Sequence, residues 1–207
     1  MIKKDFRTQS IKRLKKASKY GHYSKDKKLI ERLYREIKML DAESVMLYLP
    51  LKMEVNLYPL ILRLRKEKRK VYVPFMEGAS FRLVKYRLPL YKKQFGIKEP
   101  KDSKQYKIKQ IDIALVPIVG VDVTQRRIGF GKGMYDRFFE KNSKNIKQVV
   151  FVARELCYSP KVVTNHYDVK ADKIFTPQTW RIKHVRDSRH LCICGRHRGC
   201  THHICMD

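Results

Sequence analysis

The sequence predicts a three-layer α/β fold built on a mostly parallel central sheet. Three observations support this prediction: short apolar runs recur along the chain, segments with helical periodicity alternate with them, and a glycine-rich loop follows one of the runs. A strand, helix, strand order is typical of crossover units, which place neighbouring strands parallel. Sheets of this kind bind ligands beyond the carboxyl ends of their strands, so we expect the loop to lie there.

The chain opens with two predicted helices. From residue 2 to about residue 19, apolar residues recur at helical spacing among basic ones, as in an amphipathic helix. A second helical pattern occupies residues 25–40, and Ser24, directly before it, is a typical N-cap residue. Both helices precede the first strand.

The remaining elements alternate between apolar runs and helical patterns. A helix is predicted over residues 56–70 with Pro59 near its start, and another over 133–141, directly after the glycine loop. Pro74 is expected to end the second strand, and residues 81–87 are expected to form an edge strand. The buried strands are predicted at 44–50, 71–75, 111–117, 147–153 and 173–177.

The composition fits one globular domain that attracts anions. The chain has 207 residues, of which 43% are hydrophobic, and no apolar run approaches the ~20 residues of a membrane span. We therefore expect a cytoplasmic protein without a membrane partner. The formal net charge of +28 favours nucleotides, nucleic acid or another polyanion, but no standard nucleic-acid motif is visible. A lysine-rich proteome would give the same charge.

The last 30 residues differ in kind from the rest. They contain four of the five cysteines and show neither strand nor helix periodicity. The candidate zinc ligands are Cys192, Cys194, Cys200 and Cys205. Their spacing fits no common zinc finger, so we expect no metal there. We interpret residues 1–177 as the folded domain and residues 178–207 as a disordered or non-native tail, for example one read in a shifted frame.

The most informative segment is RIGFGKGMYD, residues 127–136. Glycines alternate with single residues, and glycine's freedom at positive φ lets the backbone N–H groups of such a loop converge on phosphate oxygens. Lys132 would add a mobile positive charge, and Asp136 could hold magnesium. The spacing matches neither a P-loop nor a dinucleotide fingerprint, and glycines alone would also fit an ordinary turn between a strand and a helix.

Several segments together resemble the 5-formyltetrahydrofolate cyclo-ligase family. The family pattern is a strand ending in proline and an apolar-Asp turn, followed by R-[LI]-G-x-G-x-G-x-Y-D and an aromatic helix. The chain has ALVPIVGVD and then RIGFGKGMYDRFF. Its other matches are Lys3 with Arg7, Leu49 with Glu54 in YLPLKMEV, GIKEP at 96–100, and NHYDVKADKIFTP with Asp168 and Asp172.

The resemblance extends from about Lys3 to Pro177 and has two departures. Met134 stands where the family usually has tyrosine, so a contact from that ring is not expected here. Tyr167 separates a histidine and an aspartate that are often adjacent in the family, which makes the alignment of Asp168 looser than that of Asp136. Neither departure removes a charged group.

The resemblance implies a Rossmann-like, CoA transferase-like fold and the ATP-dependent closure of 5-formyltetrahydrofolate to 5,10-methenyltetrahydrofolate, with release of ADP and phosphate. Arg127 and Lys132 would be the catalytic residues, Leu49 and Glu54 would contact folate, and Mg²⁺ would be the cofactor. Asp136 and Asp168 would be its ligands. The residues implied in ATP binding are Lys3, Arg7, Arg127, Ile128, Gly129, Phe130, Gly131, Lys132, Gly133, Met134 and Tyr135.

Two rival interpretations stay open at this point. The chain could be a basic nucleic-acid-binding protein whose glycine loop is only a turn, or another nucleotide or sugar-phosphate enzyme on a similar sheet. The cyclo-ligase interpretation expects small-molecule substrates, no specific nucleic acid and a monomer. Lys3 and Arg7 share one helix face at a spacing of four, and could reach a nucleotide only if the first helix folds back over the loop.

Overall fold

The computed structural model describes residues 2–19, 21–92, 98–100 and 110–178. The expected tail beyond residue 178, with its four cysteines, lies outside the described residues, as do the first two residues of the GIKEP segment. All other predicted elements and site residues can be located in the structure.

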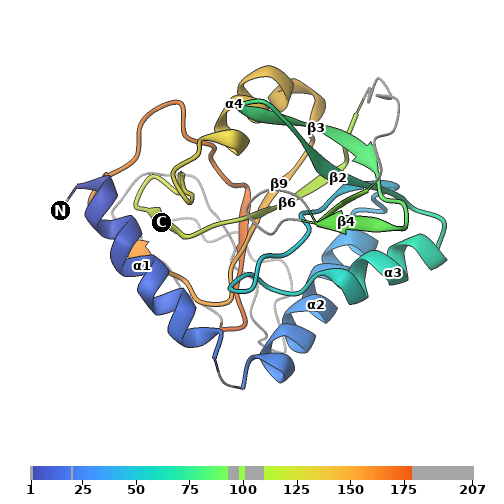
Figure 1. Cartoon of the computed structure of the whole chain (residues 1–207), viewed down its shortest axis with the longest axis horizontal. Coiled ribbons are helices and arrows are strands. Elements are labelled where there is room, and N and C mark those ends of the chain that lie inside the picture. The colour runs from blue at the N-terminus through green and yellow to red at the C-terminus, as the bar shows by residue number, and fades with distance from the viewer. Residues whose placement is uncertain (1, 20, 93–97, 101–109, 179–207) are drawn as a thin grey trace, which may run out of the picture.

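Four α-helices and eleven strands are present in the described part of the chain (Figure 1). The helices are α1 (Lys3–Ala17), α2 (His22–Met39), α3 (Tyr58–Lys66) and α4 (Met134–Asn142), the last followed by a 3₁₀ turn (Ser143–Asn145). The strands are β1 (Ser44–Met46), β2 (Lys70–Glu77), β3 (Ser80–Lys85), β4 (Leu90–Lys92), β5 (Lys98–Pro100), β6 (Ile113–Pro117), β7 (Gly120–Asp122), β8 (Arg127–Ile128), β9 (Val149–Val152), β10 (Tyr158–Ser159) and β11 (Lys173–Phe175).

The central sheet has six strands in the order β11-β9-β6-β1-β2-β3. Every neighbouring pair is parallel except β2 and β3, which form an antiparallel hairpin at one edge. The predicted mostly parallel sheet and the predicted edge strand at residues 81–87 are therefore confirmed. The β1-α3-β2 segment is the expected parallel crossover unit.

Helices cover both faces of this sheet, which makes the fold three-layered. On one face, Val45 and Leu115 belong to the same apolar cluster as Leu33 of α2 and Ile61 of α3. On the other face, alternate strand residues pack with the two buried phenylalanines of α4. Figure 1 shows α4 on one side of the strands and α2 with α3 on the other.

A smaller sheet positions α1. Strands β10, β7 and β8 pair beside the central sheet, with β7 between the other two. Phe6 and Leu14 of α1 are buried in a cluster with Val119, Ile128 and Cys157, which lie in or beside these strands. Because β8 leads into the glycine loop, this packing brings the first helix next to the loop.

Two details of the prediction are wrong. Ser24 is not the N-cap of α2: the helix begins at His22, after Gly21 adopts a left-handed φ of 60° that turns the chain out of α1. Pro74 does not end β2, which continues to Glu77. Because β2 pairs with β1 only as far as Tyr72, a residue without an N–H group is tolerated farther along, where one side of the strand has no ladder partner in the sheet.

Candidate active site

The glycine loop joins β8 to α4 at a close backbone turn. Gly133 caps α4 with a left-handed φ of 64°, so the free N–H groups of the first helical turn face the loop. A Cβ atom on Gly129 would clash with the buried guanidinium of Arg127. Glycine is required at both positions, at Gly133 for its φ angle and at Gly129 for the space that the arginine occupies.

Arg127 is a buried cation at the carboxyl end of the central sheet. Its Nε donates a hydrogen bond of 3.0 Å to the carbonyl of Pro117, the last residue of β6. Its Nη1 lies 3.8 Å from Oδ2 of Asp136, and its guanidinium lies 4.7 Å from the centre of the Tyr135 ring. Burial lowers the pKa of Arg127, and the negative charge of Asp136 opposes that shift. The strand therefore fixes this charge beside the loop.

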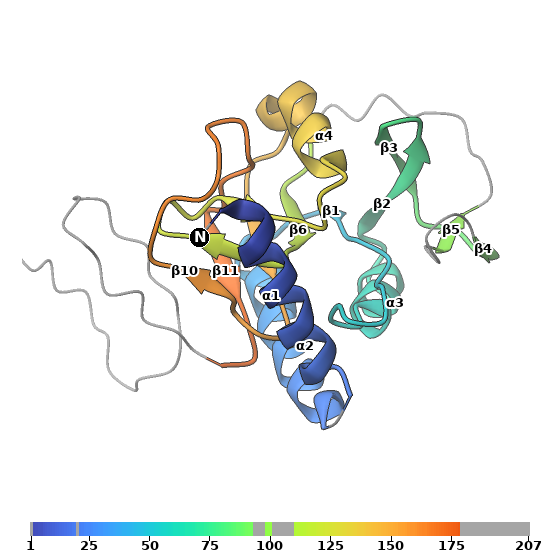
Figure 2. The same ribbon diagram turned by 60° about the vertical axis from the view of Figure 1, so that its left-hand side comes forward.

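The first helix, which lies beside β10 in Figure 2, contributes two basic side chains, one to the glycine loop and one to Asp168. Nε of Arg7 donates to the carbonyl of Gly129 at 2.9 Å, and its guanidinium also lies alongside Gly131, since a Cβ there would be 3.3 Å from Nη1. Nζ of Lys3 lies 2.5 and 2.7 Å from the two carboxylate oxygens of Asp168. The helix does fold back over the site, as the role expected for Lys3 and Arg7 requires.

The two predicted metal ligands lie on neighbouring segments. Oδ1 of Asp136 is 3.5 Å from the backbone nitrogen of Val169, the residue after Asp168. Asp168 is buried and accepts a hydrogen bond of 2.6 Å from the backbone of Asn165, in addition to its pair with Lys3. Among the described residues, no group of three or more His, Cys, Asp and Glu side chains could hold a metal ion by itself. Two carboxylates suit Mg²⁺ that takes its other ligands from phosphates and water.

The segment between β1 and α3 carries both Leu49 and Glu54. Leu49 is buried, and Oε2 of Glu54 accepts a hydrogen bond of 2.8 Å from the backbone of Leu51. Burial raises the pKa of Glu54 to about 7, against the opposing effect of that hydrogen bond and of the positive charges on Arg127 and Arg154. Glu54 is therefore electrostatically coupled to Arg127 at the start of the loop.

The other loop residues differ in what they expose. Ile128 is fully buried, so only its backbone can face a ligand, and Phe130 packs against the α1 cluster. Met134 and Tyr135 pack against the α4 side of the core, and burial raises the pKa of Tyr135, which keeps the phenol neutral. Lys132 is exposed at the tip of the loop.

Arg137 is a part of the site that the sequence reasoning missed. Its Nε donates to the carbonyl of Ala79 at 2.7 Å, and its Nη2 donates to the carbonyl of Lys132. Ala79 lies in the turn between β2 and β3, so this arginine braces the glycine loop against the hairpin. The available signal was an arginine one helical turn after the capping Gly133.

Asp122, the aspartate that ends the ALVPIVGVD segment of the family pattern, has a structural role. It is fully buried at the end of β7 and accepts hydrogen bonds from Thr124, from the backbone of Val163, and from the backbone and hydroxyl of Thr164. Burial raises its pKa, but these hydrogen bonds outweigh burial and leave the pKa below its usual value. The carboxylate therefore fixes the loop at Val163 and Thr164, which leads to Asp168.

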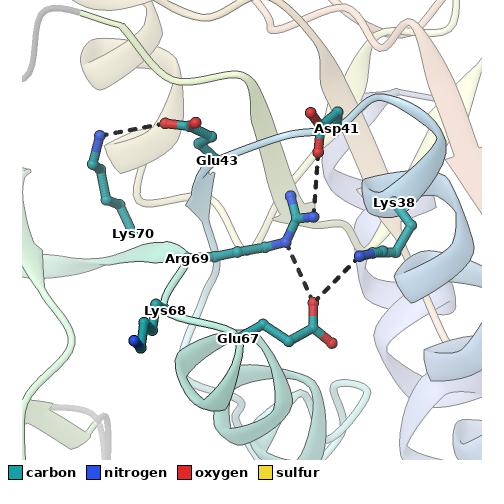
Figure 3. Close-up of a pocket in the computed structure, with 7 residues that line it drawn as sticks. All are labelled: Lys38, Asp41, Glu43, Glu67, Lys68, Arg69 and Lys70. Atoms are coloured by element: carbon teal, nitrogen blue, oxygen red, sulfur yellow. Dashed lines mark hydrogen bonds and ion pairs between the residues drawn. The ribbon is translucent and has the colours of Figure 1, made fainter.

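A hollow that is lined by charged side chains lies away from the predicted site (Figure 3). It lies at the amino ends of β1 and β2, at the opposite end of the sheet from the glycine loop. The charges around it pair with one another: Arg69 lies 3.4 Å from Glu67 and 3.5 Å from Asp41. Its lining residues are Lys38, Asp41, Glu43, Glu67, Lys68, Arg69 and Lys70. The predicted site residues are not among them.

Within the part of the chain that the structure describes, no helix combines the length and apolar character needed to cross a membrane.

Comparisons with known proteins agree on one family. The sequence model of the 5-formyltetrahydrofolate cyclo-ligase family matches residues 2–177. A 5-formyltetrahydrofolate cyclo-ligase of Haemophilus influenzae is 28% identical over 144 residues, which cover 64% of this chain and 75% of that protein. The corresponding Escherichia coli K12 protein is 25% identical over 148 residues, which cover 66% of this chain and 79% of that protein.

Two solved structures are similar to the whole fold. The solution structure of 5,10-methenyltetrahydrofolate synthetase from Aquifex aeolicus matches with a TM-score of 0.71 and 28% identity, and the match covers 98% of this chain and 100% of that chain. A 5,10-methenyltetrahydrofolate synthetase from Mycoplasma pneumoniae matches with a TM-score of 0.63 and 22% identity, and the match covers 86% of this chain and 100% of that chain.

Proposed function

The chain belongs to the 5-formyltetrahydrofolate cyclo-ligase family, and we propose that its loop from Arg127 to Asp136 binds the ATP that drives closure of 5-formyltetrahydrofolate to 5,10-methenyltetrahydrofolate. One observation carries the proposal. Charged groups from α1, from the glycine loop, from the segment around Asp168 and from the segment after β1 meet at one end of the central sheet. That end is where open α/β sheets bind ligands.

The proposed chemistry converts the formyl oxygen, a poor leaving group, into a phosphate ester oxygen, which is a good one. The formyl oxygen attacks the γ-phosphorus of ATP, the bond from that phosphorus to the β-bridging oxygen breaks, and ADP leaves. N10 of the folate then bonds to the formyl carbon and loses its proton, and the carbon–oxygen bond breaks to release phosphate. Both steps depend mainly on positioning and on neutralising phosphate charge, because the protein supplies no covalent group.

The basic residues around the loop are suited to the phosphates. Arg127 presents a planar fork that can contact two oxygens at once, and Lys132 adds a point charge at the exposed tip. The N–H groups at the start of α4 add the positive end of a helix. Arg7 reaches the same loop from α1. These groups would stabilise the charge that moves to the bridging oxygen as ADP leaves.

Asp136 and Asp168 fit Mg²⁺ as two carboxylates on neighbouring segments. When bound there, the ion would neutralise phosphate oxygens. In the structure Lys3 Nζ lies against both oxygens of Asp168, so this lysine already places a positive charge where a cation would be held. We propose that Lys3 shifts from Asp168 to the nucleotide phosphates when the nucleotide and Mg²⁺ are bound.

Glu54 and Leu49 form the proposed folate contact. A carboxylate can accept two parallel N–H groups of the kind that the pterin ring offers, and Leu49 would supply an apolar wall. The coupling between Glu54 and Arg127 supports a folate site that adjoins the phosphate site, because the formyl oxygen must reach the γ-phosphorus.

The raised pKa of Glu54 predicts a pH dependence. Only the ionised carboxylate accepts both N–H groups, and a pKa of about 7 means that it is protonated below neutral pH. The groups coupled to it are Arg127 and Arg154, which favour ionisation, and the buried phenols of Tyr48 and Tyr135. We expect kcat/KM for 5-formyltetrahydrofolate to rise with pH through about 7 and then level off.

The pH prediction is checked by initial rates across the neutral range with ATP saturating. The Glu54→Gln variant is the control, and it should lose this limb of the profile together with much of its folate affinity. A wild-type profile that is flat between pH 6 and 8, on the order of one unit either side of the pKa, would remove Glu54 from this role.

The proposed function is tested by incubating the protein with 5-formyltetrahydrofolate, ATP and Mg²⁺ and following the absorbance of the methenyl product. We expect product that requires ATP and is accompanied by stoichiometric phosphate. Absence of product across several magnesium concentrations and pH values would contradict the proposal. Magnesium-ATP should also raise the melting temperature, whereas short RNA should not, which separates this function from nucleic-acid binding.

Three expectations from the sequence remain predictions. A cytoplasmic location, a monomeric state and dispensability of the tail are untested by the fold. Truncation after Pro177 with activity retained would show that the tail is dispensable.

A further inference from the structure

We propose that the buried ion pair between Asp26 and Arg154 is a positioning pair for Glu54, and that it thereby sets the affinity for the folate substrate. This inference rests on the proposed function, because it assumes that Glu54 contacts folate. Asp26 comes from α2, and Arg154 follows the last strand residues of β9. Neither residue belongs to the glycine loop or to the groups around it.

The pair is closed to solvent and has a two-pronged geometry. Asp26 is 4% exposed and Arg154 is 7% exposed. Nε of Arg154 donates to Oδ1 of Asp26 at 2.9 Å, and Nη2 donates to Oδ2 at 2.7 Å. Two parallel charge-assisted hydrogen bonds fix the orientation of both side chains.

Both members of the pair also hold the backbone around Glu54. Nη2 of Arg154 donates to the carbonyl of Glu54 at 2.6 Å, and Oδ2 of Asp26 accepts from the backbone nitrogen of Asn56 at 3.3 Å. The segment between β1 and α3 contains no helix or strand, so such contacts determine its shape. Within the segment, Tyr48 donates to the carbonyl of Val55 at 3.2 Å. Glu54 is therefore held at its own carbonyl and two residues beyond.

The energetics favour a positioning role over a stabilising one. Removing two charges from water costs about as much as a buried pair recovers, so such pairs are poor sources of stability. Nη1 of Arg154 is buried and has no hydrogen-bond partner in the described part of the protein, which adds a further cost. A pair with these costs is explained by the conformation that it enforces on the segment carrying Glu54.

The test replaces the pair by apolar groups of similar size in the full chain, as the double variant Asp26→Leu/Arg154→Met. We expect KM for 5-formyltetrahydrofolate to rise by about 10- to 100-fold, because Glu54 is misplaced rather than removed. KM for ATP should stay within about twofold of wild type, because a misplaced Glu54 does not alter the loop contacts that bind the nucleotide. The melting temperature is measured in parallel, and we expect a folded protein, since apolar replacement of buried pairs is usually tolerated.

The matched control removes a different ion pair from the same helix. Glu36 of α2 pairs with Lys173 of β11 at 2.6 Å, far along the helix from Asp26. The double variant Glu36→Gln/Lys173→Met should leave both KM values unchanged. If it raised KM for folate as much as the Asp26/Arg154 variant does, the effect would be a general loss of α2 packing and the inference would fail.

Two further variants separate the possible failures. Glu54→Ala tests the proposed function directly: an unchanged KM for folate would remove Glu54 from the site, and the positioning role with it. If Glu54→Ala raises KM and the folded double variant does not, only the positioning role is overturned. Should the double variant not fold, Arg154→Lys keeps the charge opposite Asp26 but has no fork to reach both Asp26 and Glu54. Wild-type KM in that variant would overturn the inference.

Discussion

Replacing Lys132 with alanine is expected to lower kcat/KM for ATP by about 100- to 1000-fold, the range seen when one preorganised charged contact to a transition state is lost. Lys132 is exposed at the tip of the loop, and its backbone carbonyl is held by Arg137. The loop shape therefore depends on the backbone at this position, and the alanine variant keeps that backbone while it removes the charge of an exposed side chain. Stability should change little, since surface substitutions of this kind have small effects.

The measurement is initial-rate kinetics with ATP varied and folate saturating, combined with thermal melting. Lys141→Ala is the matched control, because Lys141 is an exposed lysine near the end of α4. It should retain wild-type kinetics. A rate within about twofold of wild type for Lys132→Ala would remove this residue from phosphoryl transfer. An equal decrease in kcat/KM for the Lys141 variant would show that the net charge of the protein, and not the position of Lys132, determines the rate.

Replacing Asp136 with asparagine is expected to raise the magnesium concentration needed for half-maximal rate by about 10- to 100-fold. Asparagine has the same shape and keeps one oxygen, but it lacks the charge that attracts a hard cation. The neighbouring Arg127 Nη1, 3.8 Å from Oδ2, would also lose its counter-charge. Because Arg127 is buried, we also expect the variant without ligands to have a lower melting temperature than the wild type.

A magnesium titration at saturating ATP measures this effect. Glu43→Gln is the control, since Glu43 is an exposed acid that lines the hollow where β1 and β2 begin, at the opposite end of the sheet from the glycine loop. Its magnesium dependence should match wild type. Unchanged magnesium dependence in Asp136→Asn would assign the metal to another ligand and leave Asp136 as the partner of Arg127 alone.

Local pattern was sufficient for most of the fold. Each apolar run of four to seven residues became a strand or part of one, because buried parallel strands need apolar residues on both faces. The errors in these elements were at boundaries, where tertiary pairing decides, and the short strands of the two smaller sheets were not predicted. Pro74 continues β2 because one side of that strand has no ladder partner there, and the start of α2 is set by the left-handed turn at Gly21 and not by Ser24.

The candidate site was predictable only where the chemistry lies within one segment. The glycine loop with Arg127, Lys132 and Asp136 can be identified from its spacing, since the conformation of a tight loop depends on neighbouring residues. Arg137 and the Asp26–Arg154 pair gave no comparable signal. An arginine or aspartate in a basic chain resembles any other until its partner is known.

The sequence by itself determined the parallel sheet, the position of the glycine-rich loop and the family to which the chain is similar. Only the tertiary structure decided that Lys3 lies against Asp168, 165 positions away, and that Arg7 reaches the loop carbonyl of Gly129. The physical reason is that hydrophobic spacing specifies which face of α1 is buried but not which surface buries it. That choice depends on how Phe6 and Leu14 pack against the small sheet, which forms only once distant strands have paired.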